Sequence, residues 1–148
     1  MPAQAQAIRD LRDKAGYLLR RAFQRSQALF TEETRDLDIT SPQYILLVAL
    51  ALRPGVDQNS LAETVDLDRW TTGDILARLE RRGLLAREVD RSDRRCRRLV
   101  LTEAGHAVVR QMEPSGISVN QKLLAPLDAE EQREFLRLLR KLVGVREV

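Results

Sequence analysis

Gly83 separates two different hydrophobic periodicities, and this change of period constrains the fold more than any other feature. Before it, residues 57–65 and 69–82 have the apolar spacing of two short helices joined by a tight turn. After it, residues 84–89 and 97–101 are typical of two strands that flank an arginine-rich loop. The pattern predicts a helix-turn-helix followed directly by a hairpin, which is the arrangement of a wing.

The segments before this region are predicted to be helical. Residues 8–34 carry apolar side chains at three- and four-residue spacing, so one helix of roughly 40 Å is expected, longer than the core of a small domain needs. A continuous apolar stripe on such a helix needs a partner, and a second copy of the chain would supply one. Ser41 is expected to cap a second helix, with Pro42 at its first position and residues 53–55 ending it. This helix is apolar on nearly every side, which predicts burial at the centre.

Two further helices are predicted after the hairpin. Thr102 is expected to cap a helix that continues towards Leu124, with Pro114 and Gly116 kinking or interrupting it. Asp128 begins the last helix with a capping-box pattern, and a broad apolar face follows. Together the elements predict a mainly α fold of the α+β class.

The positive charge of the chain is concentrated in one segment. The 148 residues include 25 basic and 22 acidic ones, a formal net charge of +3. Residues 69–98 contain ten arginines and five acidic residues, so this segment carries +5 and the remainder carries −2. Guanidinium groups suit bidentate contacts with phosphate or with guanine. The segment therefore indicates a nucleic-acid partner, and a solvated surface run is the alternative on charge alone.

The composition argues against several other classes of protein. One histidine and one cysteine, His106 and Cys96, cannot form a His/Cys metal cluster or a disulfide within one chain. The sequence has neither a nucleophile elbow nor a phosphate-binding glycine-rich loop, so we expect no enzyme activity, no metal and no cofactor. No apolar run approaches the roughly 18 residues of a membrane span, and the charged N-terminal segment lacks the apolar block of a secretory signal. A cytoplasmic protein without a membrane partner is expected.

Three motifs carry a resemblance to a known family. They are the run Leu76-Ala-Arg-Leu-Glu-Arg-Arg-Gly-Leu-Leu85, the triplet Asp93-Arg-Arg95 and the run Leu101-Thr-Glu-Ala-Gly105. Together with the order of the predicted elements, they make essentially the whole chain similar to the MarR family of bacterial transcription regulators. The combination is specific, whereas each motif alone is a weak signal.

The resemblance implies a winged helix-turn-helix with long N- and C-terminal dimerisation helices. The chain 1–148 is then a single domain, in which residues 1–40 and 103–148 form the dimer and residues 41–102 bind DNA. The family implies an obligate homodimer that places two recognition helices in successive major grooves of a pseudo-palindromic operator on double-stranded DNA. Most members are repressors that leave the DNA when a small molecule binds. We therefore expect release by a small aromatic effector, such as a phenolic compound, an aromatic acid or a thioester.

The resemblance also assigns roles to single residues. Those expected to contact DNA are Arg69, Trp70, Thr71, Asp74 and Arg78 on the recognition helix and Arg94 and Arg95 on the wing. Asp93 is expected to hold the wing through a salt bridge. The ligand pocket is expected to use Tyr17, Arg20, Arg21, Tyr44, His106 and Arg110.

The sequence leaves several alternatives open. Asp74 either accepts a hydrogen bond from a cytosine amino group or pairs with Arg78 one turn on. Trp70 contacts thymine methyl groups or a sugar, or it folds back over Leu67. The arginines around Cys96 would lower the pKa of its thiol and favour a redox-responsive regulator, and a small structural residue of the wing is the alternative. A winged-helix module that binds an acidic protein partner is the remaining alternative function.

Overall fold

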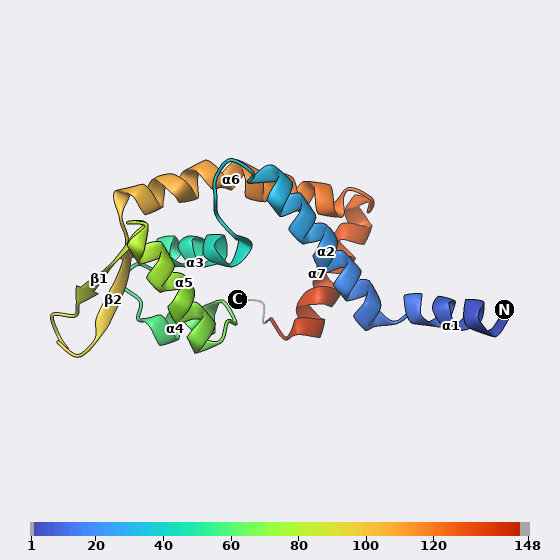
Figure 1. Ribbon diagram of the computed structural model, residues 1–148, viewed down its shortest axis with the longest axis horizontal. Helices are drawn as coiled ribbons and strands as arrows, with labels where there is room; N and C mark the ends of the chain where they lie inside the picture. Colours follow the sequence, from blue (N-terminus) through green and yellow to red (C-terminus); the bar gives the residue numbers. More distant parts are fainter. Residues whose placement is uncertain (1, 146–148) are drawn as a thin grey trace. The chain divides into compact units, whose positions relative to one another are not determined.

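The chain forms two compact units in the computed structural model, which describes residues 2–145, with side chains from residue 4 onward. Residues from Phe30 to Gly116 form the winged unit, and residues up to Leu29 together with those from Ile117 form the helical unit. The predicted mainly α fold of the α+β class is confirmed (Figure 1). The described elements are α1 (Pro2–Arg12), α2 (Ala15–Glu33), α3 (Ser41–Leu52), α4 (Gln58–Thr64), α5 (Arg69–Arg81), β1 (Leu85–Val89), β2 (Arg97–Leu101), α6 (Glu103–Leu124) and α7 (Ala129–Val143).

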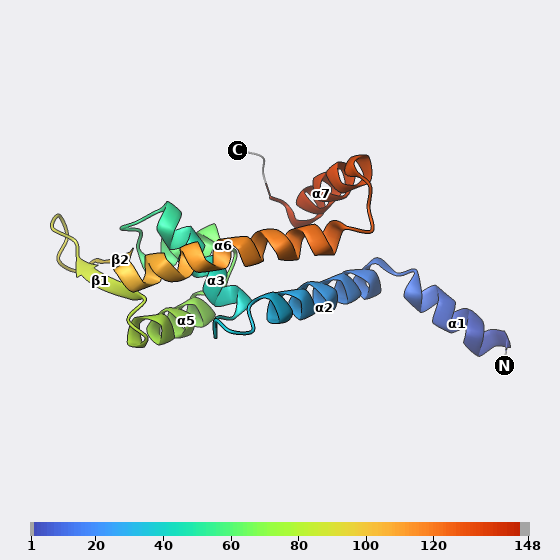
Figure 2. The ribbon, with the colours of Figure 1, turned by 90° about the horizontal axis from the view of Figure 1, so that it is seen from above.

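The core of the winged unit is built around α3. Its residues Leu46, Leu47 and Leu50 are at most 1 % exposed, as the nearly continuous apolar sequence of this helix predicts. α3, α4 and α5 pack against one another, and the hairpin extends away from them (Figures 1 and 2). Each neighbouring element adds apolar side chains to the same cluster, among them Leu61 of α4, Leu76 and Leu79 of α5, Leu99 of β2 and Met112 of α6.

Two aspartates cap the helices of the helix-turn-helix, as predicted. The Asp57 side chain accepts a hydrogen bond from the Ser60 amide at 3.0 Å at the start of α4. The Asp68 side chain accepts one from the Thr71 amide at 2.8 Å at the start of α5. Asp66, in the turn between the helices, has φ 53°, in the left-handed region that non-glycine residues rarely adopt. Asp57 therefore fixes the start of α4, and Asp68 fixes the end of the strained turn that leads into α5.

The predicted hairpin is present and is anchored at its base. Gly83, with φ 72°, ends α5 and turns the chain into β1. The two strands pair antiparallel, with Leu85 opposite Leu101. Val56, in the α3–α4 loop, forms an additional bridge with Leu99 of β2, and its carbonyl accepts from the Leu99 amide at 2.9 Å. The loop before α4 thus pairs with β2 at the base of the wing.

The Leu-Thr-x-x-Gly motif joins the base of the wing to α6. The Thr102 hydroxyl donates to the Gly83 carbonyl at 2.6 Å and accepts from the Gly105 amide at 3.1 Å, which confirms the predicted cap. A Cβ added to Gly105 would collide with the carbonyl oxygen of Leu84. The motif is therefore explained by close backbone packing at this junction.

The predicted single helix over residues 8–34 is wrong. α1 ends at Arg12 and α2 begins at Ala15, so the helix breaks at residues 13–14. The break coincides with an aspartate, and Gly16 follows two residues after the lysine; aspartate and glycine are poor helix formers. The apolar spacing continues across the break, so periodicity alone does not reveal it.

The cap of α3 is Thr40 rather than the predicted Ser41. The Thr40 hydroxyl accepts from the Gln43 amide at 3.4 Å, and the Gln43 side chain accepts from the Thr40 amide at 3.0 Å. This reciprocal capping box satisfies two amides at once. Pro42 then occupies the second helical position, where the missing N–H would have no partner within the helix.

A kink or an interruption was expected at Pro114 and Gly116. The interruption is wrong, because α6 runs without a break from Glu103 to Leu124, and the kink stays a prediction. A proline removes the hydrogen bond to the carbonyl four residues earlier, here that of Arg110. Pro114 and Arg110 are both exposed, so water can solvate that carbonyl. A Cβ on Gly116 would lie 2.9 Å from the Tyr44 hydroxyl oxygen, so this glycine permits the close approach of the tyrosine.

The helical unit leaves its apolar side chains at the surface. Leu124 is the one buried side chain among its described residues. No helix within residues 2–145 combines the length and the hydrophobicity that crossing a membrane requires. The exposed large apolar residues of this unit are Ile8, Leu11, Leu18, Leu19, Phe23, Ile117, Phe135, Leu138, Leu142, Val143 and Val145.

Candidate DNA-binding surface

α5 is anchored by its inner face and by its first turn. Thr72, Leu76 and Leu79 are fully buried, and Asp68 caps the helix. The residues predicted to read DNA occupy other positions of the same helix, so the core fixes the direction in which they point. These are Arg69, Trp70, Thr71, Asp74 and Arg78.

Asp74 and Arg78 form an ion pair one turn apart. Arg78 Nη2 lies 3.1 Å from Asp74 Oδ2, and the two side chains are 60 % and 43 % exposed, respectively. This confirms the predicted pairing in the DNA-free protein. An exposed pair at this spacing contributes only about 0.3–0.5 kcal/mol to stability. Its main effect is to neutralise the carboxylate and to hold the guanidinium of Arg78 on the exposed side of α5.

Trp70 does not fold back over the turn. Its side chain is 81 % exposed, whereas a ring that covered Leu67 would lose most of its exposed surface. The fold-back interpretation is therefore wrong. The thymine and sugar interpretations of Trp70 stay predictions.

Arg81 extends the outer face of α5 and was missed by the sequence reasoning. Trp70, Asp74, Ala77 and Arg81 recur at three- and four-residue spacing opposite the buried residues, and we call this line the outer face. Arg81 is exposed. The same helical spacing was the signal that could have found it.

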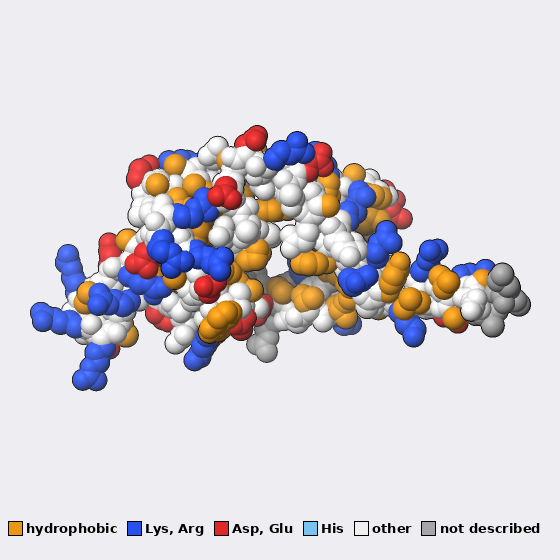
Figure 3. All heavy atoms as spheres, viewed as in Figure 1, with side chains coloured by type: hydrophobic (Ala, Val, Ile, Leu, Met, Phe, Trp, Pro, Cys, Tyr) orange, Lys and Arg blue, Asp and Glu red, His pale blue; other side chains and the backbone are white. Residues whose placement is uncertain are grey.

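Arginine side chains surround the tip of the wing. Arg94 and Arg95, both predicted to contact DNA, are exposed. Figure 3 shows Lys and Arg side chains projecting in several directions at the end of the molecule that the hairpin occupies in Figure 1. The wing therefore presents a cationic tip that is free of covering side chains in this view.

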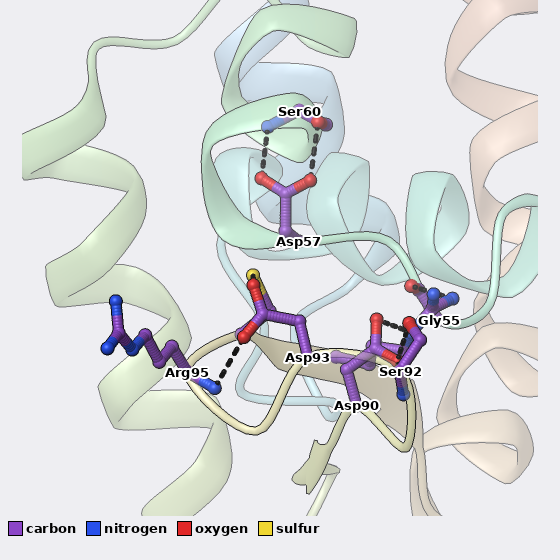
Figure 4. A network of polar contacts seen from close by, with 9 residues as sticks. Gly55, Asp57, Ser60, Asp90, Ser92, Asp93 and Arg95 are labelled. Atoms are coloured by element: carbon purple, nitrogen blue, oxygen red, sulfur yellow. Dashed lines mark hydrogen bonds and ion pairs between the residues drawn. The ribbon is translucent and has the colours of Figure 1, made fainter.

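The salt bridge predicted for Asp93 is wrong, because its carboxylate accepts hydrogen bonds within the loop instead. Its Oδ1 accepts from the Arg95 amide at 3.0 Å, and its Oδ2 accepts from Cys96 Sγ at 3.5 Å (Figure 4). An aspartate that accepts from an amide two residues on closes an Asx turn. Asp93 does hold the wing, but it does so by shaping the tip, and an ion pair of the wing belongs to Asp90.

Asp90 ties the wing to the α3–α4 loop. Its carboxylate accepts from the Ser92 amide at 2.8 Å, from the Ser92 hydroxyl at 2.7 Å and from Arg98 Nε at 2.7 Å. Arg98 Nη1 also donates to the Gly55 carbonyl at 3.3 Å. The hydrogen bonds from Ser92, followed by the Arg98 guanidinium, hold the pKa of Asp90 well below its usual range. The charged form of Asp90 therefore maintains this connection.

Arg87 connects β1 with α5 and α4, and it was not singled out from the sequence. Its Nε donates to Glu80 of α5 at 3.0 Å, and its Nη1 donates to Gln58 of α4 at 3.0 Å. The side chain projects from β1 and is only 27 % exposed. A Cβ on Gly73 would lie 2.8 Å from Gln58 Nε2, so the glycine leaves room for the Gln58 side chain that Arg87 contacts. One guanidinium thus fixes the angle between the recognition helix and the wing.

The thiol of Cys96 is less acidic than the sequence predicts. Its hydrogen bond to Asp93, followed by the charge of that carboxylate, raises the pKa of Cys96. The predicted lowering by neighbouring arginines is therefore wrong, because the group that the thiol contacts is an anion. The side chain is exposed. A protonated thiol is a poor nucleophile, which removes the main support for the redox interpretation.

The predicted ligand-pocket residues fall in both units. Tyr17, Arg20 and Arg21 lie on α2 in the helical unit. Arg21 Nη1 donates to the Tyr17 hydroxyl oxygen at 3.3 Å, and this hydrogen bond lowers the pKa of Tyr17. The Tyr17 phenol thus lies beside the Arg21 guanidinium on α2.

The other three predicted pocket residues lie in the winged unit. Tyr44 lines a hollow of about 330 Å³ between α3 and α4, and its ring centroid lies 6.2 Å from that of Phe30. Burial raises the pKa of Tyr44. His106 is exposed, and Arg110 pairs with Glu103 at 3.2 Å. A common pocket for the two groups stays a prediction.

Comparisons with known proteins cover nearly the whole chain. A family model described as MarR family matches residues 37–95. The transcriptional regulator HosA of Escherichia coli is 41 % identical over 134 residues, which cover 90 % of this chain and 98 % of HosA. The transcriptional repressor NicR of Pseudomonas putida is 34 % identical over 134 residues, which cover 90 % of this chain and 85 % of NicR. The solved structure of BpsR from Bordetella bronchiseptica, whose DNA binding is regulated by 6-hydroxynicotinic acid, matches with a TM-score of 0.86 at 31 % identity over 91 % of this chain and 96 % of BpsR.

Proposed function

Because the chain belongs to the MarR family of transcription regulators, we propose that it is a dimeric repressor that leaves its operator when a small aromatic acid binds. The observation that carries the proposal is the reading surface, in which α5 and the wing are anchored on one core and expose arginines. Relatives include a repressor and a protein whose DNA binding an aromatic acid regulates. Bound operator excludes other proteins from the promoter, and the proposed place of action is the cytoplasm, where bacterial DNA lies.

The proposed contacts divide between the two grooves of DNA. α5 enters the major groove, where its side chains meet base edges and the phosphates beside them. The wing tip reaches the adjacent minor groove, whose narrow segments attract guanidinium groups. The contact residues are Arg69, Trp70, Thr71, Asp74 and Arg78 on α5, with Arg94 and Arg95 on the wing.

The helical unit is the proposed dimerisation part, within residues 1–40 and 103–148. With Leu124 as the one buried side chain among its described residues, this unit has almost no core of its own. Its α2, α7 and the α6–α7 turn line an open apolar groove of about 540 Å³, with Phe23 and Phe135 on its walls. So large an exposed apolar surface marks an interface. A second copy of the helical unit supplies matching apolar surface.

The proposed effector is a hydroxylated aromatic or heteroaromatic acid. Arginines bind a carboxylate, and tyrosines pack against an aromatic ring. The residues proposed to line its site are Tyr17, Arg20, Arg21, Tyr44, His106 and Arg110. Binding favours a dimer whose two recognition helices no longer match the spacing of two half-sites, so release is a shift of population.

Operator selection from random duplexes, followed by salt titration, tests DNA binding. The wild-type dimer is expected to recover a pseudo-palindromic site. Arg95→Ala is expected to weaken binding to all sequences and to reduce the salt slope by about one, since it removes one phosphate contact. Arg133→Ala on α7 removes the same charge from the helical unit and is the matched control. A protein that recovers no preferred sequence is not a sequence-specific repressor.

Titration of the operator complex with aromatic acids tests the effector class. Hydroxybenzoic and hydroxynicotinic acids are expected to release the DNA, and cyclohexanecarboxylic acid, which keeps the charge and lacks the aromatic ring, is expected to leave it bound. Equal effects of aromatic and alicyclic acids would contradict the proposed pocket chemistry.

A further inference from the structure

Trp70 is the most exposed large apolar side chain of the described residues, at 81 %. It is also the only tryptophan of the chain. It occupies the second position of α5, in the turn with which a recognition helix meets base edges. The buried Thr72 and Leu76 fix the rotation of the helix, so the indole cannot turn into the core. An aromatic ring is therefore held at the reading end of the helix without a partner in the winged unit.

The neighbours of Trp70 on α5 suit a DNA partner. Arg69 precedes it and pairs loosely with Glu63, at 3.7 Å, through exposed side chains. One turn on, the carboxylate of Asp74 is neutralised by Arg78. Trp70 is thus preceded by an exposed arginine and followed by a carboxylate whose charge is offset, so no unpaired anion of this face opposes the approach of DNA phosphates.

The chemistry of the major groove then selects what the ring touches. The C5-methyl group of thymine is the one apolar group that base edges present there. An indole has a large apolar surface, one N–H donor and no acceptor, so it cannot make the paired contacts by which amides recognise adenine. We propose that Trp70 packs against a thymine methyl group in each half-site and so specifies a T:A pair opposite the first turn of α5. This rests on the proposed function, because it requires α5 to lie in the major groove.

Replacement of thymine by deoxyuridine in the selected operator tests the proposal. Deoxyuridine pairs as thymine does and lacks only the methyl group. We expect one thymine in each half-site to be sensitive to this replacement. Replacing it in one half-site is expected to weaken affinity about fourfold, which corresponds to the loss of one buried methylene-sized group. Replacement in both half-sites is expected to cost about fifteenfold. Every other thymine is expected to tolerate the change.

Variants assign the effect to Trp70. Trp70→Ala is expected to bind the thymine operator more weakly and to bind thymine and deoxyuridine duplexes equally. Trp70→Leu, which keeps an apolar contact, is expected to retain part of the difference. Leu52→Ala is the matched control, since Leu52 is 77 % exposed in the same unit but lies at the end of α3, and it is expected to keep the full difference.

Tryptophan emission gives a second readout, because Trp70 is the sole source. Operator binding is expected to protect it from acrylamide quenching. A protected Trp70 with no thymine-dependent affinity at any position would place the ring on the sugar–phosphate backbone and overturn the proposal. So would a Trp70→Ala variant that still distinguishes thymine from deoxyuridine. Failure to select any operator would instead contradict the proposed function.

Discussion

Thr72 carries a buried side-chain hydroxyl that no hydrogen bond satisfies within the described structure. The residue is fully buried on the inner face of α5. Thr72→Val keeps the branched shape and replaces the hydroxyl by a methyl group. A buried hydroxyl without a partner costs about 1–3 kcal/mol in mutational data. Threonine and valine have similar helix propensities, so no backbone effect offsets this gain. We therefore expect the free energy of unfolding to rise by about 1–3 kcal/mol.

Thermal and urea unfolding of the DNA-free protein measure this change. A chain of this size gains about 2–4 °C in Tm per kcal/mol, so Tm is expected to rise by about 2–12 °C. Protein concentration is held fixed, since the stability of a dimer depends on it. Thr71→Val is the matched control, because it makes the same replacement at the neighbouring position of α5, which is only half-buried, and it is expected to produce no comparable rise in Tm. If Thr72→Val melts at or below the wild-type temperature, the hydroxyl has a partner and the reasoning fails.

Three further predictions concern the turn and the wing. Asp66→Gly is expected to raise the free energy of unfolding by about 0.5–1 kcal/mol, because the backbone strain that it removes at φ 53° costs more free energy than the added flexibility of glycine in the unfolded chain. A lower urea midpoint would contradict this. Asp93→Asn is expected to speed alkylation of Cys96 by iodoacetamide at pH 8, because that carboxylate raises the thiol pKa, and an unchanged rate would show that it does not. Asp90 has a depressed pKa in the folded protein, so its stabilising effect is complete above the unfolded pKa of about 3.9 and is lost as the pH falls further. The melting temperatures of wild type and Asp90→Asn are compared from pH 7 down to pH 2. Their difference is expected to stay constant and to shrink only below about pH 4. A difference in Tm that already shrinks near pH 6 would implicate another group.

Most helix caps were predictable because each depends on residues within one turn, and the one wrong prediction, Ser41 in place of Thr40, is off by a single residue. Asp57, Asp68 and Thr102 all cap as expected, and Asp128 accepts from the Glu131 amide at 2.9 Å in the expected capping box. The first long helix was not predictable in the same way. A break at residues 13–14 changes neither the apolar spacing nor the charge pattern, so only backbone geometry reveals it.

The contacts of the wing were harder to predict, because they depend on which atoms a loop brings together. Asp90 and Asp93 are both aspartates of one short loop, and the sequence does not show which of them Arg98 reaches. Once the strands are in register, Arg98 meets Asp90, and Asp93 turns back to its own backbone. Cys96 follows the same logic, since a count of neighbouring arginines misses the one anion that touches the thiol.

The reading surface is ordered before it meets DNA, and this limits how a ligand can release it. α5 is fixed by its buried face and its cap, and the wing is fixed by the contacts of Arg98 with Gly55 and of Arg87 with Gln58. All of these contacts lie within the winged unit. A preorganised surface loses little conformational entropy on binding. Under the proposed function, regulation therefore has little to gain by melting α5 or the wing, and it acts instead on the spacing between two intact copies of the reading surface in the dimer.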